Sequence, residues 1–314
     1  MKARTTRIAA LTAGAIGLLT AATVQPAAAQ GDPVPGRGNV YYFAGAYNLE
    51  GEAQAVVQFG NDDDVVYFGD WYGDGIDLPL VRRGNTFYVP DEDEPSRTAA
   101  VFSYGDAGDT VLAGDWDGDG IDSLAVRRGN HYFVKNDNRT TGTADRDFVY
   151  GDPGDTVLVG NWDGLLAAPT DGQPGKGDTL LVRRGNRYFV KNDLVSGPAD
   201  YYKDFGSDTD AVFAADWVDG GERADDHFLA AAQDGDGADQ LIVRRGNQFI
   251  ASAELRIESQ VSYLGSEYTS FYGDPGDAVF VAHLPSELTE QEARDWHDDD
   301  GFIDADGLGV RRTR

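Results

Sequence analysis

The most distinctive stretch of the sequence is an acidic loop from Asp115 to Asp122, which reads Asp-Trp-Asp-Gly-Asp-Gly-Ile-Asp. Carboxylates at alternate positions, followed by a glycine, let a loop wrap its side chains around a hard cation. Ca²⁺ prefers six to eight oxygen ligands at about 2.3–2.6 Å, and this loop offers most of them. We therefore predict a calcium site formed by Asp115, Asp117, Asp119 and Asp122 with the backbone carbonyl of Ile121.

This loop is not an EF-hand, because its twelfth position is Val126 instead of Glu and its flanking residues are typical of strands. The alternative is an ordinary turn, since Asp and Gly both favour turns. Four acids within eight residues would repel one another without a cation, and this favours calcium.

Related loops occur elsewhere in the chain. In the stretch from 70 to 77, Tyr72 replaces one acid, and we predict calcium ligands at Asp70, Asp74, Ile76 (carbonyl) and Asp77. Three other copies depart from the pattern and are predicted to be decayed sites. They are Asp234–Asp239 with Ala232 in the first ligand position, Asn161–Gly164 with an insertion that leaves Asp178 distant, and Asp298–Gly301.

Trp occupies the second position of four such loops, at Trp71, Trp116, Trp162 and Trp217. A ring of exposed indoles could stack on sugars, and these residues are our only ligand-binding candidates. The alternative interpretation is that they pack between repeats. Arg pairs also recur, and neighbouring strand residues face opposite ways, so one Arg of each pair should reach each side. We expect ion pairs with Asp, and the alternative is a ring of Arg side chains that binds an acidic ligand.

No catalytic motif is present. The four His residues form no zinc-binding pattern, and the chain has no cysteine and no phosphate-binding Gly-Lys-Ser/Thr sequence. The paired carboxylates of glycosidases leave no short signature. However, the acids here recur at one repeat position, whereas an active site usually breaks repeat symmetry. We therefore predict that the protein is not an enzyme.

The elements that position these loops are short repeated strands. Val-Arg-Arg-Gly-Asn recurs at 81–85, 126–130, 182–186 and 243–247, and the segments around it are β-branched and aromatic, which is typical of strands. In the clearest copy we predict strands at Thr110–Gly114, Ser123–Arg128, His131–Lys135 and Asp147–Tyr150. Gly129-Asn130 then forms a hairpin turn.

A four-stranded unit of about 45 residues is typical of a β-propeller blade. The chain starts with two strands of such a unit (40–43 and 55–59) and finishes with the other two (278–282 and 308–312). We predict an all-β propeller of five four-stranded blades, closed by pairing of the first strands with the last. The single domain spans 30–314, with repeats at about 60–105, 106–151, 152–206, 207–273, and 274–312 completed by 37–59.

These residues resemble the FG-GAP/VCBS-type repeat, the blade unit of integrin α-subunit heads and of many bacterial secreted proteins. The resemblance covers about 37–312 and is most specific at Asp115–Asp122. It implies structural calcium in the loop that joins the first two strands of a blade. The family usually has Asp at the ninth loop position, where this chain has Ser123 and Leu78, and it commonly has seven units.

Residues 1–29 read as a secretory signal peptide: a basic start, an apolar run and the small-residue end Ala27-Ala28-Ala29. The apolar run is weak and short for a membrane anchor. The formal net charge of −28 disfavours nucleic acid and anionic membranes as partners. We expect a secreted or cell-surface monomer that has no membrane span.

Three inserted loops follow the Asp-Trp step, at 165–176, 218–233 and 285–303. Loops on a rigid scaffold are the usual place for recognition. We therefore predict a calcium-stabilised binding or adhesion module for an extracellular protein or cell-wall glycan. The alternatives are a structural surface or matrix protein, and a hydrolase acting on extracellular polysaccharide.

Overall fold

The computed structural model describes residues 31, 33–34, 37–44, 55–163, 176–215, 238–252, 266–271, 278–285 and 304–311. The predicted signal peptide lies outside these ranges. Most of the three inserted loops lies outside them as well. Within the described ranges, no helix has the length and apolar character needed to cross a bilayer.

All strands in these ranges belong to four-stranded antiparallel sheets, and four sheets consist of consecutive strands, which we call blades 1 to 4. Blade 1 contains β3 (Val65–Gly69), β4 (Leu78–Arg83), β5 (Thr86–Pro90) and β6 (Thr98–Ser103). Blade 2 contains β7 (Thr110–Gly114), β8 (Ser123–Arg128), β9 (His131–Lys135) and β10 (Arg146–Val149). Blade 3 contains β11 (Thr156–Gly160), β12 (Thr179–Arg184), β13 (Arg187–Lys191) and β14 (Tyr201–Asp204). Blade 4 contains β15 (Ala211–Ala215), β16 (Gln240–Arg245), β17 (Gln248–Ser252) and β18 (Ser266–Phe271).

A further sheet, the terminal sheet, combines strands from the two ends of the chain. Its order is β19 (Ala278–Pro285), β20 (Asp304–Arg311), β1 (Val40–Ala44) and β2 (Ala55–Gln58). β1 lies antiparallel to β20, with Tyr41 opposite Arg311. The predicted pairing of the first strands with the last is therefore present.

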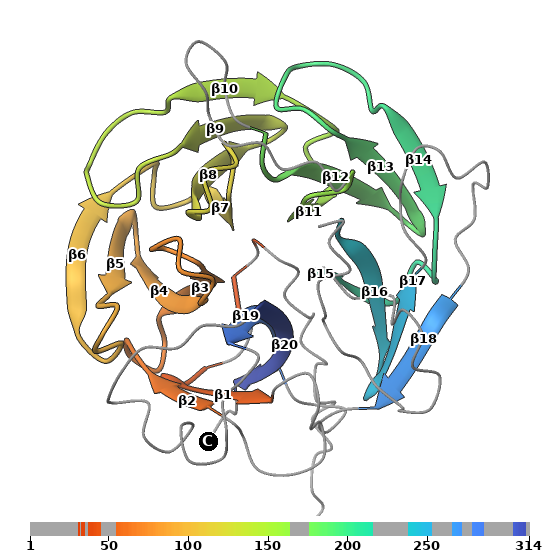
Figure 1. Cartoon of the computed structure of the whole chain (residues 1–314). Helices are drawn as coiled ribbons and strands as arrows, with labels where there is room; N and C mark the ends of the chain where they lie inside the picture. The colour runs from red at the N-terminus through yellow and green to blue at the C-terminus, as the bar shows by residue number, and fades with distance from the viewer. Residues whose placement is uncertain are drawn as a thin grey trace, which may run out of the picture.

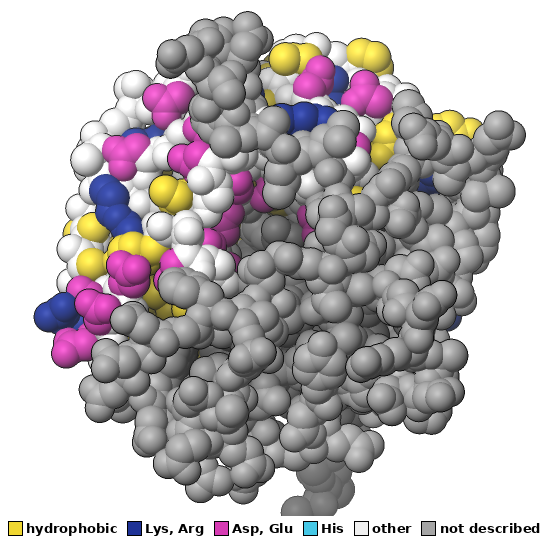
Figure 2. Space-filling view, viewed as in Figure 1, with side chains coloured by type: hydrophobic (Ala, Val, Ile, Leu, Met, Phe, Trp, Pro, Cys, Tyr) yellow, Lys and Arg dark blue, Asp and Glu magenta, His cyan; other side chains and the backbone are white. Residues whose placement is uncertain are grey.

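The sheets are arranged around a common centre (Figure 1). Their innermost strands contact one another in the order β3, β7, β11, β15, β19 and back to β3. On the face shown in Figure 2, several acidic side chains of the described residues lie near the centre. The prediction of an all-β propeller with four-stranded antiparallel blades is confirmed.

Local sequence explains the strand boundaries in blade 2. Three of its four strands have the predicted bounds, and β10 lies one residue earlier than predicted. Gly129 has φ +66°, in the left-handed region that the turn between β8 and β9 requires and that glycine adopts without strain.

The apolar core lies between neighbouring blades, because the inner strands of blades 1 to 4 bury both of their faces. One cluster joins blade 1 to blade 2 and includes Tyr67, Leu80, Phe102, Val111 and Val126. Similar clusters join blades 2 and 3, blades 3 and 4, and blade 1 and the terminal sheet. Each blade thus depends on its neighbours for burial.

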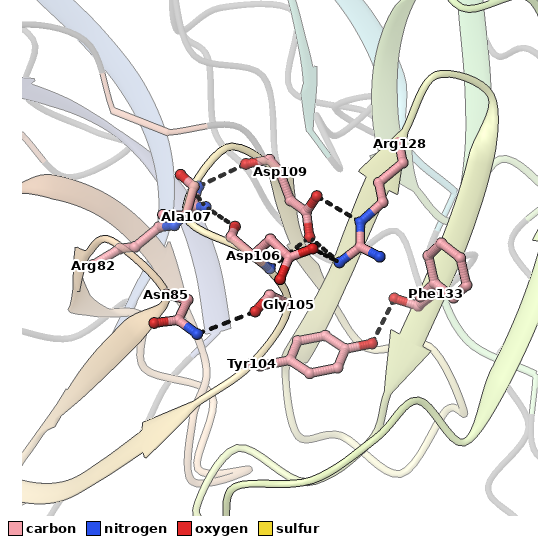
Figure 3. Close-up of polar contacts among 9 residues, drawn as sticks. All are labelled: Arg82, Asn85, Tyr104, Gly105, Asp106, Ala107, Asp109, Arg128 and Phe133. Carbon is pink, nitrogen blue, oxygen red and sulfur yellow. Dashed lines mark hydrogen bonds and ion pairs between the residues drawn. The ribbon is translucent and has the colours of Figure 1, made fainter.

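The turn that joins blade 1 to blade 2 is held by arginines from both blades (Figure 3). Arg128 of blade 2 donates two hydrogen bonds to the carboxylate of Asp109, both 2.7 Å long. Arg82 of blade 1 donates to the backbone carbonyls of Asp106, Ala107 and Asp109. The predicted ion pairing of the repeated arginines is confirmed for Arg128, and Arg184 and Arg245 form the equivalent pairs.

The Arg128–Asp109 pair predicts acid sensitivity, because the hydrogen bonds from Arg128 lower the pKa of the Asp109 carboxyl. A carboxyl whose folded-state pKa lies below its unfolded value of about 3.9 stabilises the fold above that pH. This stabilisation is lost as the pH falls through the folded-state pKa. Asp109→Asn should therefore reduce the free energy of unfolding at pH 7 by about 1–3 kcal/mol.

Urea unfolding between pH 7 and about 2.5 measures this effect. The difference between Asp109→Asn and wild type should shrink below about pH 4, as the wild-type carboxylate is protonated. Asp208→Asn, at an exposed position, is the control and should differ little from wild type at any pH. A difference that stays constant down to the lowest pH contradicts the prediction.

Candidate metal centre

The loop between β7 and β8 of blade 2 brings three of its predicted ligands together. Carboxylate oxygens of Asp115, Asp117 and Asp119 lie within 4.8 Å of one another. Two ligands of one Ca²⁺, each at about 2.3–2.6 Å, can be separated by about 5 Å at most. The geometry of this trio therefore fits one shared ion.

The first carboxylate organises this loop. Asp115 accepts hydrogen bonds from the backbone N–H groups of Gly118 (2.8 Å), Asp119 (3.2 Å) and Gly120 (3.0 Å). Gly120 has φ +84°, a conformation that side chains other than glycine rarely adopt. The chain thus turns around Asp115 and carries Asp117 and Asp119 to the same side.

The negative charge of the trio is only partly compensated by the described residues. Burial, together with the charge of Asp119, raises the pKa of the Asp115 and Asp117 carboxyls. The charge of Arg146 opposes this rise at Asp117. None of the three forms an ion pair with a Lys or Arg in the described part of the chain. A bound cation would supply the missing positive charge.

Asn136 is a neighbour of the site that sequence reasoning missed. Its side-chain N–H donates to Asp117 Oδ2 at 2.6 Å, and it lies directly after β9. The amide thus fixes one carboxylate of the trio from the same blade. The signal in the sequence was an Asn at the equivalent position of blade 3, Asn192.

Asp122, predicted as a fourth carboxylate ligand, is placed differently. Its Oδ2 accepts a hydrogen bond from the backbone N–H of Asp70 in blade 1 (2.8 Å), and its own N–H donates to the Asp70 carbonyl (2.7 Å). Burial, with the charges of Asp77 and Asp178, raises its pKa well above the ordinary value. Ile121 remains near the trio, since its N–H donates to Asp119 Oδ1 (2.9 Å).

The contact made by Asp122 is repeated between other blades. Asp178 of blade 3 makes it with Asp115, and Asp239 of blade 4 makes it with Asn161. We call Asp122, Asp178 and Asp239 the inter-blade aspartates. Each carboxylate lies against a glycine that ends the inner strand of the preceding blade: Gly69, Gly114 or Gly160. A Cβ at these glycines would lie 2.6–2.8 Å from the carboxylate oxygen.

The loop of blade 1 turns around its first aspartate in the same way as the blade 2 loop, but it contains fewer acids. Asp70 accepts hydrogen bonds from the N–H groups of residues 72 to 75, and Asp74 accepts one from Ile76 (3.0 Å). Burial raises the pKa of Asp74 to about 6, and the nearby Asp70 adds to this rise. Asp77 does not join Asp70 and Asp74 in a metal-type group of three within the described residues.

A loop from blade 2 braces this part of blade 1. The Arg139 guanidinium lies 4.3 Å from the ring centroid of Tyr72, the residue that replaces an acid. Arg139 also donates to the carbonyl of Trp71 (2.9 Å). The side-chain amide of Asn138 donates to the carbonyls of Trp71 (3.2 Å) and Asp122 (2.7 Å). Positive charge near the blade 1 loop therefore comes from the protein itself.

The remaining loops are described only in part. In blade 3, Asp163 forms an ion pair with Lys176 across an insertion whose residues 164–175 are not described. The blade 4 loop at 216–237, with Trp217 and most of Asp234–Asp239, lies outside the described ranges, as does Asp298–Gly301.

The exposed-indole interpretation is wrong for three of the four tryptophans. Trp71, Trp116 and Trp162 are 1%, 2% and 1% exposed. The indole N–H of Trp71 donates to the Leu78 carbonyl and that of Trp116 to the Ser123 carbonyl. They pack within the inter-blade cores, because a large apolar ring stabilises the fold most when it is buried.

Comparisons with known proteins identify no family. No family model and no curated protein matches the chain. A chain in a structure of a mutant Photorhabdus luminescens Tc holotoxin pore matches with 12% sequence identity and a TM-score of 0.37. The match covers 91% of this chain and 14% of that chain, so this chain spans a small part of that chain's length. An overall similarity this low supports no conclusion about fold or function.

The contact between Gly114 and Asp178 can be tested by adding one methyl group. In Gly114→Ala the new Cβ would lie 2.7 Å from Val159 Cγ1 and 2.8 Å from Asp178 Oδ2. We expect the free energy of unfolding to fall by about 1–3 kcal/mol, because the core is overpacked and the inter-blade contact is displaced. Urea unfolding measures this change.

Gly108→Ala is the matched control, since nothing lies within 4 Å of its added Cβ. This variant should be neutral or more stable by up to about 1 kcal/mol, because alanine restricts the unfolded chain. Equal effects of the two substitutions would show that the close approach at Gly114 is unimportant.

Proposed function

We propose that this chain is a secreted, calcium-stabilised β-propeller that acts as a binding or adhesion module for an extracellular protein or cell-wall glycan. The observation that carries the calcium proposal is the convergence of Asp115, Asp117 and Asp119, whose carboxylates form no ion pair within the described residues. In this proposal calcium stabilises the loop and performs no chemistry.

We count the terminal sheet as a fifth blade. Its four antiparallel strands repeat the organisation of blades 1 to 4, and the inner-strand contacts return from β19 to β3. Pairing of β20 with β1 covers an edge of each strand that would otherwise be exposed, and a closed ring of five blades explains why strands from both chain ends pair. The acidic loops between the first two strands of blades 1 and 2 fit the resemblance to FG-GAP/VCBS-type repeats.

Calcium suits the blade 2 loop better than magnesium does. Mg²⁺ demands near-ideal octahedral geometry at about 2.0–2.1 Å, whereas Ca²⁺ accepts irregular sets of oxygens. The trio supplies three carboxylates from one turn. Blade 1 is the second candidate, with Asp70, Asp74, Ile76 and Asp77. Extracellular modules bind calcium at about 10⁻⁴–10⁻³ M, which suits an exported protein.

The binding role is favoured over an enzymatic role because packing accounts for the inner acids. Asp122, Asp178 and Asp239 each bind the backbone of a neighbouring blade at one repeated position. Recognition is then assigned to the inserted loops at 165–176, 218–233 and 285–303, carried on a rigid ring. A structural surface or matrix protein is the alternative, and a polysaccharide hydrolase is a weaker one.

Calcium should raise the thermal stability of the protein, because it binds the folded loop and not the unfolded chain. At about 10 mM calcium and the affinity above, the gain is about 1–3 kcal/mol. The melting temperature should rise by a few degrees over that in a chelator, and Asp117→Ala with Asp119→Ala should remove this rise. Differential scanning calorimetry measures both effects.

Asp93→Ala with Asp208→Ala is the charge-matched control, since both positions are exposed and distant in sequence from the trio. It should keep the full response to calcium. Identical melting curves of the wild-type protein with and without chelator would refute the calcium proposal.

The binding proposal is tested with the purified protein on an array of cell-wall glycans and extracellular proteins, in the presence of calcium. We expect saturable binding that is weakened when residues 218–233 are replaced by a short Gly-Ser linker, because the scaffold remains while the recognition loop is lost. Release of monosaccharides or oligosaccharides from any glycan would instead favour the hydrolase.

A further inference from the structure

The loop of blade 3 contains a cation that belongs to the chain itself. Lys176 Nζ forms an ion pair with Asp163 Oδ2. The two side chains are 34% and 19% exposed, so the pair is partly shielded from solvent. The pair lies in the loop between β11 and β12, which is the equivalent of the blade 2 loop that holds the acidic trio.

Equivalent inter-blade contacts align the first residues of the two loops, Asp115 and Asn161. The N–H of Asp115 donates to Asp178, and the N–H of Asn161 donates to Asp239 in the same way. Asp163 follows Asn161 by two residues, as Asp117 follows Asp115. Asp163 therefore occupies the position of Asp117, a member of the trio.

Lys176 enters from the end of the loop. It precedes Asp178 by two residues, as Gly120 precedes Asp122 in blade 2. Gly120 has no side chain, and its backbone N–H donates to Asp115. Lys176 instead has an ammonium group, which forms the ion pair with Asp163. The other nearby lysine of blade 3, Lys191, pairs with Asp193 at 2.6 Å.

The charges of the two loops differ accordingly. Blade 2 has three converging carboxylates and no ion-pair partner for them in the described residues. Blade 3 has Asn161 in place of the first acid, and its Asp163 is matched by one ammonium group. A carboxylate that is removed from water needs a partner charge, which an ammonium group or a metal ion can supply.

We propose that Lys176 is a tethered cation that takes, in blade 3, the role assigned to calcium in blade 2. Asp163 therefore binds no metal ion in the wild-type protein. The comparison rests on the calcium site proposed for blade 2, but the claim concerns Asp163 and Lys176 and is tested on them alone.

The test uses Lys176→Met, Asp163→Asn and the double variant, with melting temperatures measured in a chelator and in 10 mM calcium chloride. In the chelator, Lys176→Met should lower the melting temperature by about 2–4 °C, and the double variant by less, because no unpaired carboxylate remains. Calcium should raise the melting temperature of Lys176→Met by more than it raises that of the wild type. The double variant should show no such extra gain.

Lys191→Met is the matched control, because it breaks another Lys–Asp ion pair of blade 3. The Asp193 side chain of that pair is 54% exposed, so water can solvate its carboxylate when the lysine is removed. It should show the wild-type response to calcium. The proposal is overturned if Lys176→Met gains no more from calcium than the wild type, or if the extra gain persists without Asp163.

The two proposals fail separately. A wild-type protein insensitive to calcium, with an extra gain in Lys176→Met, would refute the blade 2 site and support Lys176 as a substitute for metal. A calcium-responsive wild type without that extra gain would refute only the role of Lys176. If Lys176→Met does not fold, calcium titration of Asp163→Asn decides: the number of bound ions should equal that of the wild type, and one ion fewer overturns the proposal.

Discussion

The structure depends on a repeated contact in which an aspartate carboxylate of one blade binds the backbone of the preceding blade. Asp122, Asp178 and Asp239 each accept an N–H from the residue that begins the preceding loop and donate their own N–H to its carbonyl. This two-way contact joins neighbouring blades at the ends of their inner strands. It also explains the glycines at the ends of the inner strands, because any side chain there would displace the carboxylate.

This contact ties the candidate metal loop to its neighbours. Asp115 begins the blade 2 loop and organises its turn, and the same residue is held by Asp178 of blade 3. At the other end of the loop, Asp122 holds blade 1. A single ion at the trio would therefore restrain three blades. The equivalent loops of the three blades carry different charged groups: three acids in blade 2, two acids beside Tyr72 in blade 1, and the Asp163–Lys176 ion pair in blade 3.

Local patterns in the sequence were sufficient to predict the strands of blade 2 and the hairpin at Gly129, because these follow from short-range turn chemistry. The pairing of the two chain ends was predicted from the repeat, because each end supplies only two strands of a four-stranded unit. The trio was also predictable, since its members lie within five residues of one another. The contact of Asp122 with Asp70 was not predicted, because Asp70 is 52 residues away in the neighbouring blade. Asn136 was missed for a similar reason, since its contact with Asp117 spans two strands. Burial of the tryptophans depends on how blades pack, which the repeat alone left open.

The brace between blades 1 and 2 bears on how the protein can be produced. Asn138-Arg139-Thr140 matches the acceptor triplet for N-linked glycosylation, and such acceptors are normally surface residues. Asn138 is 5% exposed, and its amide nitrogen is already engaged by two carbonyls. The folded chain therefore offers no access to an oligosaccharide-transferring enzyme. A sugar attached before folding would separate the two blades at this point, so a host that lacks this modification is the appropriate source of the native protein.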